Sequence, residues 1–316
     1  MGTKIFCFGT VVADFITRDI SEIPAPGDSA RSSDISLAVG GCAANTATGL
    51  ARLGHPVSLC GAVGDDDLGT FLHRDLTQEG VQLDHLSVEP GISTAVSLII
   101  NVTGQDRRII SAPGANEAAW PDRFDEDQLQ EAAVVSFHGY GLSKRPDVED
   151  TERILRAAKR SGATTVLDVI VIPGEDLLAD LKRLLPLVDV FLPNLDEARR
   201  LTGETDPRAA ASQLRGLGAT TVVVTCGDQG LAWESSEGAG VLAALAVDEV
   251  DATGCGDAFA AGWIDAVYRG ADFEEKLLAG SSMGALVAMA PGAIEGLPQR
   301  AGLDDMMQSL QRSLSI

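Results

Sequence analysis

The chain has 316 residues, a formal net charge of −22 and 45% hydrophobic residues, with aromatic residues at only 4%. This length suits one large α/β domain with a full core, and we expect a single domain over residues 1–316. The negative charge argues against nucleic acid and anionic membranes as partners, and no apolar run approaches the roughly 20 residues that span a bilayer. Five cysteines without a C-x-x-C pair indicate reduced thiols and a cytoplasmic protein.

Most of the chain alternates short apolar runs with helical stretches. Runs rich in β-branched residues lie at 164–171, 188–194 and 219–227, and stretches of helical character follow them. Continuous apolar strands that alternate with helices predict a mostly parallel sheet with helices on both faces. Ligands of such sheets bind beyond the carboxyl ends of the strands, so the residues after each strand are the candidates for chemistry.

Two stretches interrupt this alternation. Residues 11–44 show little helical periodicity, and residues 93–112 indicate two strands joined by a turn at Thr-Gly-Gln-Asp. We expect the two stretches to pair into a small separate sheet that forms a lid over the strand ends.

The segment DATGCGDAFAAG, at 251–262, is the first candidate site. An extended stretch at 240–252 is expected to lead into it, and a helix is expected to begin near Asp257. The backbone N–H groups from Gly254 to Asp257 would then form an anion site at a helix N-terminus. A carboxylate beside that site could accept a proton from an attacking hydroxyl. Asp257 could equally be a simple N-cap, because Asp is favoured there.

A paired glycine at Gly40 and Gly41 precedes a helix that is expected to start near Asn45. Such a turn lets a ligand approach the backbone, and the Asn45 amide can both donate to and accept from a polyol. Asp14, after the first apolar run, is a third polar group at a strand end. A helix cap at Asn45 and a loop carboxylate at Asp14 are the simpler interpretations.

Two further motifs follow apolar runs. In PNLDEARRLTG, Asn194 and Glu197 are three residues apart, which suits Mg²⁺ held mostly through water or, equally, a capping box. In VTCGDQG, the hydroxyl of Thr225 and the turn between Gly227 and Gly230 could face a nucleotide, although the same pattern is typical of a hairpin.

These motifs occur in an order and spacing that resemble those of the ribokinase-like (PfkB) carbohydrate kinases. The resemblance runs nearly end to end, through VGGCAANTA, GAVGDDDLG, SAPGAN, PNLDEARRLTG, VTCGDQG and DATGCGDAFAAG. It implies a ribokinase-type α/β fold with a β lid that often serves as a dimer interface, and an enzyme that transfers the γ-phosphate of ATP to a sugar hydroxyl.

The resemblance also implies roles for individual residues. Asp257 would be the general base, and Gly254, Cys255 and Gly256 would supply the anion hole. The other roles implied are sugar binding by Asp14, Gly41 and Asn45, Mg²⁺ binding by Asn194 and Glu197, nucleotide binding by Asn194, Thr225, Gly227 and Gly230, and monovalent cation (K⁺) binding by backbone oxygens of Asp251 and Thr253, with Gly292 a weaker candidate. Asp168 is a possible second carboxylate near the metal.

The chain departs from the family at several positions. Cys255 stands where a small Ala, Gly or Ser is usual, and Cys42 stands where ribokinases carry Lys after the paired glycine. His138 stands where ribokinases carry a Glu, which makes ribose doubtful and leaves His138 as a substrate-binding candidate. Arg107, beside the second lid strand, could reach an acidic or phosphorylated substrate, or could be an exposed strand-end residue.

The leading hypothesis is thus an ATP- and Mg²⁺-dependent sugar kinase acting on a primary hydroxyl, and assembled as a homodimer through the lid. A nucleoside kinase of the same fold is the nearest alternative. A non-catalytic sugar or nucleotide sensor is a third, but a binding module needs no general base.

Overall fold

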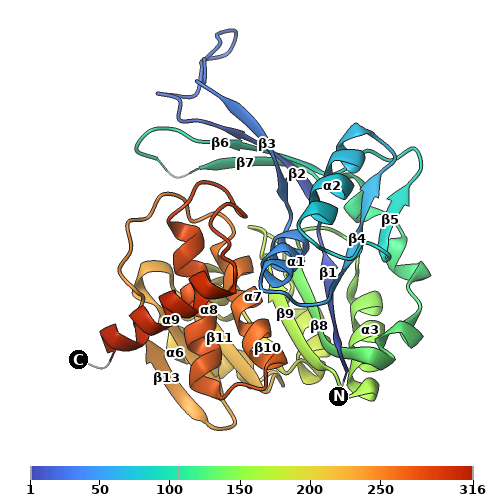
Figure 1. Ribbon diagram of the computed structural model, residues 1–316, viewed down its shortest axis with the longest axis vertical. Coiled ribbons are helices and arrows are strands. Elements are labelled where there is room, and N and C mark those ends of the chain that lie inside the picture. The colour runs from blue at the N-terminus through green and yellow to red at the C-terminus, as the bar shows by residue number, and fades with distance from the viewer. Residues whose placement is uncertain (1, 106, 315–316) are drawn as a thin grey trace.

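The computed structural model describes residues 2–105 and 107–314, and its described residues form two sheets (Figure 1). The large sheet has nine strands in the order β13-β12-β11-β10-β9-β8-β1-β4-β5. The run from β11 to β5 is parallel, and β12 and β13 are antiparallel additions at one edge. The strands are β1 (Lys4–Gly9), β4 (Val57–Gly64), β5 (Leu86–Glu89), β8 (Ala132–Tyr140), β9 (Thr164–Val169), β10 (Val190–Phe191), β11 (Thr221–Thr225), β12 (Leu231–Ser235) and β13 (Gly238–Leu242). The predicted, mostly parallel sheet is confirmed.

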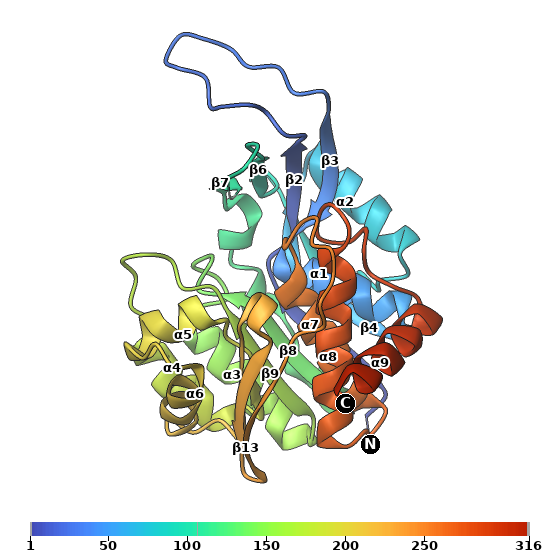
Figure 2. The ribbon, with the colours of Figure 1, turned by 90° about the vertical axis from the view of Figure 1, so that its left-hand side faces the viewer.

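Helices cover both faces of this sheet, and each face has its own core. Side chains alternate along β1, so that Ile5 and Cys7 join one core whereas Phe6 and Phe8 join the other. The first core contains residues of α1 (Cys42–Arg52), α2 (Asp67–Gln78), α7 (Cys255–Tyr268), α8 (Phe273–Ala288) and α9 (Arg300–Leu314). The second contains residues of α3 (Val148–Ser161), α4 (Leu178–Leu184), α5 (Leu195–Thr202) and α6 (Pro207–Arg215). Figure 2 shows the sheet between these two groups of helices.

The strand order reverses at β1. The chain passes from β1 to β4 on one side, whereas β8 and the later parallel strands lie on the other. In open α/β sheets, ligands bind in the crevice beyond the carboxyl ends of strands at such a switch point. Here that crevice lies beyond Gly9 and His138, which are neighbours in the parallel register of β1 and β8.

The small sheet lies beyond the carboxyl ends of these strands, at the top of Figure 1. Its order is β3-β2-β6-β7, with β2 (Val12–Thr17), β3 (Ile35–Gly40), β6 (Val96–Ile100) and β7 (Arg108–Ala112). The two predicted stretches therefore do pair into a separate sheet. Of the predicted turn between β6 and β7, Asp106 lies outside the described residues. No described helix combines the length and apolar character needed to cross a membrane.

Candidate active site

The N-terminus of α7 differs from the sequence prediction. The helix begins at Cys255 with Gly254 as its N-cap, so Asp257 is the third helical residue and its side chain makes no cap hydrogen bond. The cap interpretation of Asp257 is therefore wrong. Of the strand or extended stretch predicted at 240–252, only the part up to Leu242 is strand, at the end of β13, and a loop leads from there to the helix.

Gly254 is required by this geometry. Its φ of 78° is in the left-handed region, and a Cβ at this position would lie 2.7 Å from the Cβ of Ala293. In the described chain, the N–H groups of Gly256 and Asp257 donate to no backbone or side-chain acceptor, whereas the N–H of Cys255 makes a turn bond of 3.3 Å to Ala252 O. The open donors at this helix end are thus mainly those of residues 256 and 257.

The Asp257 carboxyl is buried against α1. Its Oδ2 accepts a 2.8 Å hydrogen bond from Asn45 Nδ2, and its backbone carbonyl accepts one of 3.2 Å from Thr46 Oγ1. The helix α1 begins at Cys42, three residues before the predicted start, and this places Asn45 inside its first turn. Burial raises the pKa of Asp257 to about 7, and hydrogen bonds from Asn45 and Cys42 act in the opposite direction. A buried carboxyl with this pKa can accept a proton near neutral pH.

Four carboxyls from different elements share this environment. Burial raises the pKa of Asp14 and of Glu197 to about 7, and raises the pKa of Asp168 well above its usual value, with Glu197 and Asp257 adding to the rise at Asp168. The ligand atoms of Cys42, Asp168 and Asp257 lie within 4.8 Å of one another. No ion pair joins any of the four carboxyls to a Lys or Arg in the part of the chain that the structure describes. This donor set suits a divalent cation such as Mg²⁺.

The paired glycine holds the chain close to Asp14 and β1. Gly41 has φ 95°, and a Cβ there would lie 2.5 Å from Thr10 O; a Cβ at Gly40 would lie 2.0 Å from Asp14 Oδ2. The Asp14 carboxylate thus fills the space over Gly40 that was predicted for a ligand. Asp14 itself lies within β2 rather than in a loop, and is 6% exposed.

Asn194 and Glu197 form the capping box that the sequence left open. Asn194 Oδ1 accepts from Glu197 N at 2.9 Å, and Glu197 Oε2 accepts from Asn194 N at 2.8 Å. Each side chain keeps polar atoms beyond this pair. The backbones of Asn194 and Thr225 form an isolated parallel β-bridge, so the capping box lies beside the turn after β11. That turn does join antiparallel strands β11 and β12, as a hairpin pattern predicts.

Three of the four predicted nucleotide residues meet in one cavity of about 410 Å³, whereas Asn194 is not among its lining residues. Thr225, Gly227 and Gly230 line one side of it, and Cys255 and Gly256 line another. Sequence reasoning missed its apolar wall, made of Leu231, Ala244, Leu245, Ala246, Val247, Phe259, Ala285 and Ala288. These residues come from β12, the loop after β13, α7 and α8, and no local motif marks them.

Asp251 and Thr253 connect two loops near this cavity. Asp251 Oδ1 accepts from Thr253 N and Oγ1 at 2.8 and 2.6 Å, and Oδ2 accepts from Gly292 N at 2.9 Å. Burial tends to raise the pKa of Asp251, but these hydrogen bonds and the charge of Arg107 bring it below its usual value. Burial raises the pKa of Cys255, and the charge of Arg107, the residue before β7, acts in the opposite direction.

His138 lies near the carboxyl end of β8, where it was predicted, but its ring is enclosed by protein. Its ring is 1% exposed, with Nε2 2.9 Å from Ser136 Oγ and Nδ1 3.4 Å from Thr46 Oγ1. Burial lowers its pKa to about 3, so the imidazole is neutral. Because both ring nitrogens face protein hydroxyls, the structure does not present this side chain to a substrate.

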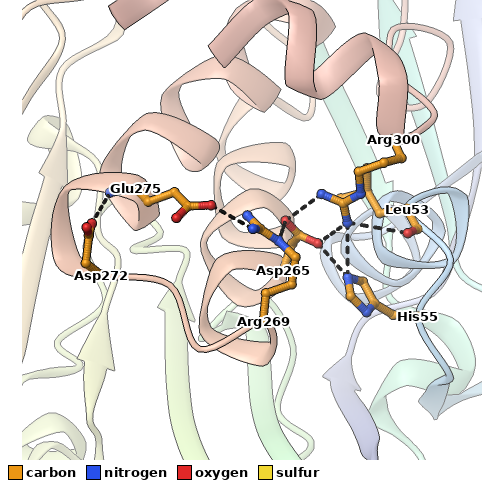
Figure 3. Close-up of polar contacts among 7 residues, drawn as sticks. All are labelled: Leu53, His55, Asp265, Arg269, Asp272, Glu275 and Arg300. Carbon is orange, nitrogen blue, oxygen red and sulfur yellow. Dashed lines mark hydrogen bonds and ion pairs between the residues drawn. The ribbon is translucent and has the colours of Figure 1, made fainter. Parts of the chain in front are cut away.

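Buried Asp265 holds the other end of α7 (Figure 3). Its Oδ1 lies 2.6 Å from His55 Nε2, and its Oδ2 lies 3.0 Å from both Arg269 Nε and Arg300 Nη1. Burial acts to raise its pKa, but these partners lower it well below the usual value. The network ties α7 to the residues after α1 and to α9, and so restricts the helix that carries Asp257.

Comparisons with known proteins agree with this geometry. The family model for pfkB family carbohydrate kinases matches residues 2–300. A 2-dehydro-3-deoxygluconokinase of Bacillus subtilis is 28% identical over 89% of this chain and 90% of that protein, and an aminoimidazole riboside kinase of Salmonella typhimurium is 30% identical over 85% and 88%. A solved ribokinase of Arabidopsis thaliana, complexed with ribose and ATP, has a TM-score of 0.84 at 26% identity and covers 98% of this chain and 99% of its own. The chain therefore belongs to the pfkB family of carbohydrate kinases and is a phosphotransferase.

Proposed function

We propose that the protein transfers the γ-phosphate of ATP to a primary hydroxyl of a sugar, with Asp257 as the general base. The observation that carries this proposal is a buried carboxyl, with a pKa of about 7, in the same helical turn as the open N–H of Gly256. A base and an anion-binding backbone meet there at the end of the 410 Å³ cavity.

In this proposal Asp257 accepts the proton of the sugar hydroxyl as its oxygen attacks the γ-phosphorus. Asn45 orients the carboxylate through its 2.8 Å hydrogen bond and keeps part of it ionised by lowering its pKa. The N–H groups of Gly256 and Asp257, with the helix dipole behind them, stabilise the charge on the transferring group. A phosphoryl transfer needs mainly such positioning and charge stabilisation.

ATP is assigned to the 410 Å³ cavity. Its apolar wall suits a purine ring, and the turn at Thr225 and Gly227 suits the polar part of the nucleotide. Glu197 and Asp168, through carboxylate oxygens that accept no hydrogen bond among the described residues, and Asn194, through the second lone pair of Oδ1, are proposed to hold Mg²⁺ directly or through water, and this ion would neutralise phosphate charge. Backbone oxygens of Asp251 and Thr253 are proposed for a monovalent cation, because the Asp251 carboxylate is already used between two loops.

The sugar is assigned to the space between Asp257 and the small sheet, where Asp14, Gly41 and Asn45 lie. Asn45 Oδ1 is buried and has no hydrogen-bond partner among the described residues, so it can accept from a sugar hydroxyl. The charge of Arg107 near Cys255 favours a substrate that carries a negative group. The Bacillus relative is named for such a sugar acid.

A nucleoside kinase is the second candidate, and the name of the riboside kinase from Salmonella supports it. A panel of neutral sugars, sugar acids, sugar phosphates and nucleosides, assayed for ADP release, separates these possibilities. We expect the highest kcat/KM for a sugar acid or sugar phosphate. A preference for nucleosides would replace the proposed substrate class, and no ADP release across the panel would favour a sensor.

The outer face of the small sheet supports a homodimer. Leu37, Phe15, Leu98 and Ile110 are paired in register across its four strands, and Ile110 is 64% exposed. Such a continuous apolar row is unusual on a monomer surface, and a second copy could cover it.

The five cysteines form no disulfide, which supports a reducing, cytoplasmic location.

A further inference from the structure

A second cavity lies at the other end of the large sheet, where its parallel strands begin. It has a volume of about 340 Å³ and is formed where β9, β10 and β11 begin, with the last turn of α3 and the first turn of α8. This is the lower edge of the sheet in Figure 1, away from the small sheet at the top. None of its lining residues lines the 410 Å³ cavity.

Lysine is concentrated at this cavity. The chain has five lysines, and two of them, Lys159 and Lys276, line it. Lys159 Nζ donates one hydrogen bond of 2.7 Å to Asp189 Oδ1, which leaves two of its three donors. Lys276 forms no ion pair within the described part of the chain. In a protein with a net charge of −22, the ammonium group of Lys276 and the two remaining donors of Lys159 favour a ligand with anionic oxygens.

One acidic residue of the cavity balances one of these charges, because Asp189 forms an ion pair with Lys159. Asp189 is fully engaged, because its Oδ2 accepts from Thr165 N at 2.9 Å and from Thr165 Oγ1 at 3.0 Å while its Oδ1 accepts from Lys159. Glu237 is exposed at the rim, where water screens its charge. The interior of the cavity is therefore left with the charge of Lys276 and the free donors of Lys159.

Hydroxyl groups without protein partners line the same space. Thr164, Thr220, Thr221 and Ser236 contribute side-chain hydroxyls that make no hydrogen bond among the described residues. Thr221 as a whole is only 8% exposed, yet its hydroxyl oxygen is accessible to solvent. Hydroxyls both donate and accept, so they suit phosphate oxygens as well as the hydroxyls of a polyol.

An indole forms part of the wall. Trp263, in the middle of α7, is 1% exposed and its Nε1 has no acceptor among the described residues. Phe273 packs against it edge-on, with ring centroids 5.7 Å apart. A buried N–H without an acceptor is unfavourable, but Nε1 is closed off from the cavity, so the indole contributes only apolar surface to the wall.

From these observations we infer that the cavity binds a small phosphate monoester of a polyol. The phosphate is a near-dianion with several acceptor oxygens, which match Lys276, Lys159 and the surrounding hydroxyls. The carbon chain would lie against Trp263 and Phe273. This inference concerns a second site and does not rest on the proposed function.

Glycerol 3-phosphate is the probe, titrated calorimetrically into the full-length protein saturated with Mg²⁺ and a non-hydrolysable ATP analogue. Saturation fills the nucleotide cavity, so that binding there does not contribute. We expect one site per chain and a change in tryptophan fluorescence. Lys276→Ala and Thr221→Val should each weaken binding, by about tenfold for the lysine, and Lys276→Arg should restore most of the affinity.

Lys182→Ala, at an exposed position of α4, is the matched control and should bind as the wild type does. Thermal unfolding of each variant confirms that it is folded. The inference is overturned if the saturated protein binds no glycerol 3-phosphate, if the ATP analogue competes with it, or if Lys276→Ala and Thr221→Val bind as tightly as Lys182→Ala.

Discussion

Replacing Asp257 by asparagine tests both the general base and the energetic cost of burying it. The residue is 9% exposed, and burial raises the carboxyl pKa from 3.8 to about 7. A carboxyl whose pKa is higher in the folded than in the unfolded state favours folding below its unfolded pKa, and this contribution is lost as pH rises through the folded pKa. For Asp257 the loss occurs between pH 3.8 and about 7.

The size of the effect follows from the shift. About 3 pKa units correspond to about 4 kcal/mol of stability lost at pH 8, whereas at pH 5 less than about 2 kcal/mol has been lost. Asparagine has nearly the same shape and does not ionise. In the absence of ligands, we therefore expect Asp257→Asn to raise the free energy of unfolding by about 4 kcal/mol at pH 8 and by about 2 kcal/mol at pH 5.

Urea unfolding at the two pH values measures this difference, and ADP release measures the chemistry. Turnover should fall by about 10²–10⁴-fold in Asp257→Asn. The kcat/KM of the wild type should rise with pH, and the midpoint of this rise should lie at about pH 7. Asp14→Asn is the comparison variant, because it removes a neighbouring carboxyl whose pKa is also about 7 and leaves the proposed base in place. A stability gain that is the same at both pH values would refute the buried-carboxylate reasoning, and undiminished ADP release would refute the base.

Three further changes test other parts of the structure. Gly254→Ala should abolish most ADP release and destabilise the fold by about 1–3 kcal/mol through its contact with Ala293, whereas Gly256→Ala, with no atom within 4 Å of the new Cβ, should leave the unfolding midpoint unchanged. Asp265→Asn should lower the free energy of unfolding in urea by about 1–3 kcal/mol, because it removes the buried carboxylate that accepts hydrogen bonds from the partly exposed Arg269 and Arg300; a loss below about 0.5 kcal/mol would contradict this. Leu98→Lys should shift the protein to a monomer in sedimentation, and an unchanged dimer would place the interface elsewhere.

The glycine motifs made much of the site predictable from sequence. Gly41 and Gly254 have positive φ and approach other backbone too closely for a Cβ, so their presence just before helices indicated the turns. The order of these motifs along the chain also indicated the fold, because alternating apolar runs and helices have few stable arrangements.

Local patterns failed where the deciding contacts were distant in sequence. Asp257 at the start of an apolar helix has the pattern of a cap, but Asn45, 212 residues away, takes its carboxylate. His138 follows the strand pattern of a substrate contact, yet Ser136 and Thr46 enclose its ring. The apolar stretch after Leu242 was predicted as strand or extended chain, and no local pattern indicated that it forms the wall of a cavity.

The sequence by itself determined the parallel sheet, the small second sheet and the turns that need glycine, because periodicity and backbone conformation are local properties. Only the tertiary structure decided which groups share one environment. Asp14, Asp168, Glu197 and Asp257 come from four separate elements, and their pKa values rise because the fold removes them from water together. Burial of this kind depends on the whole packed chain, which is why no motif could report it.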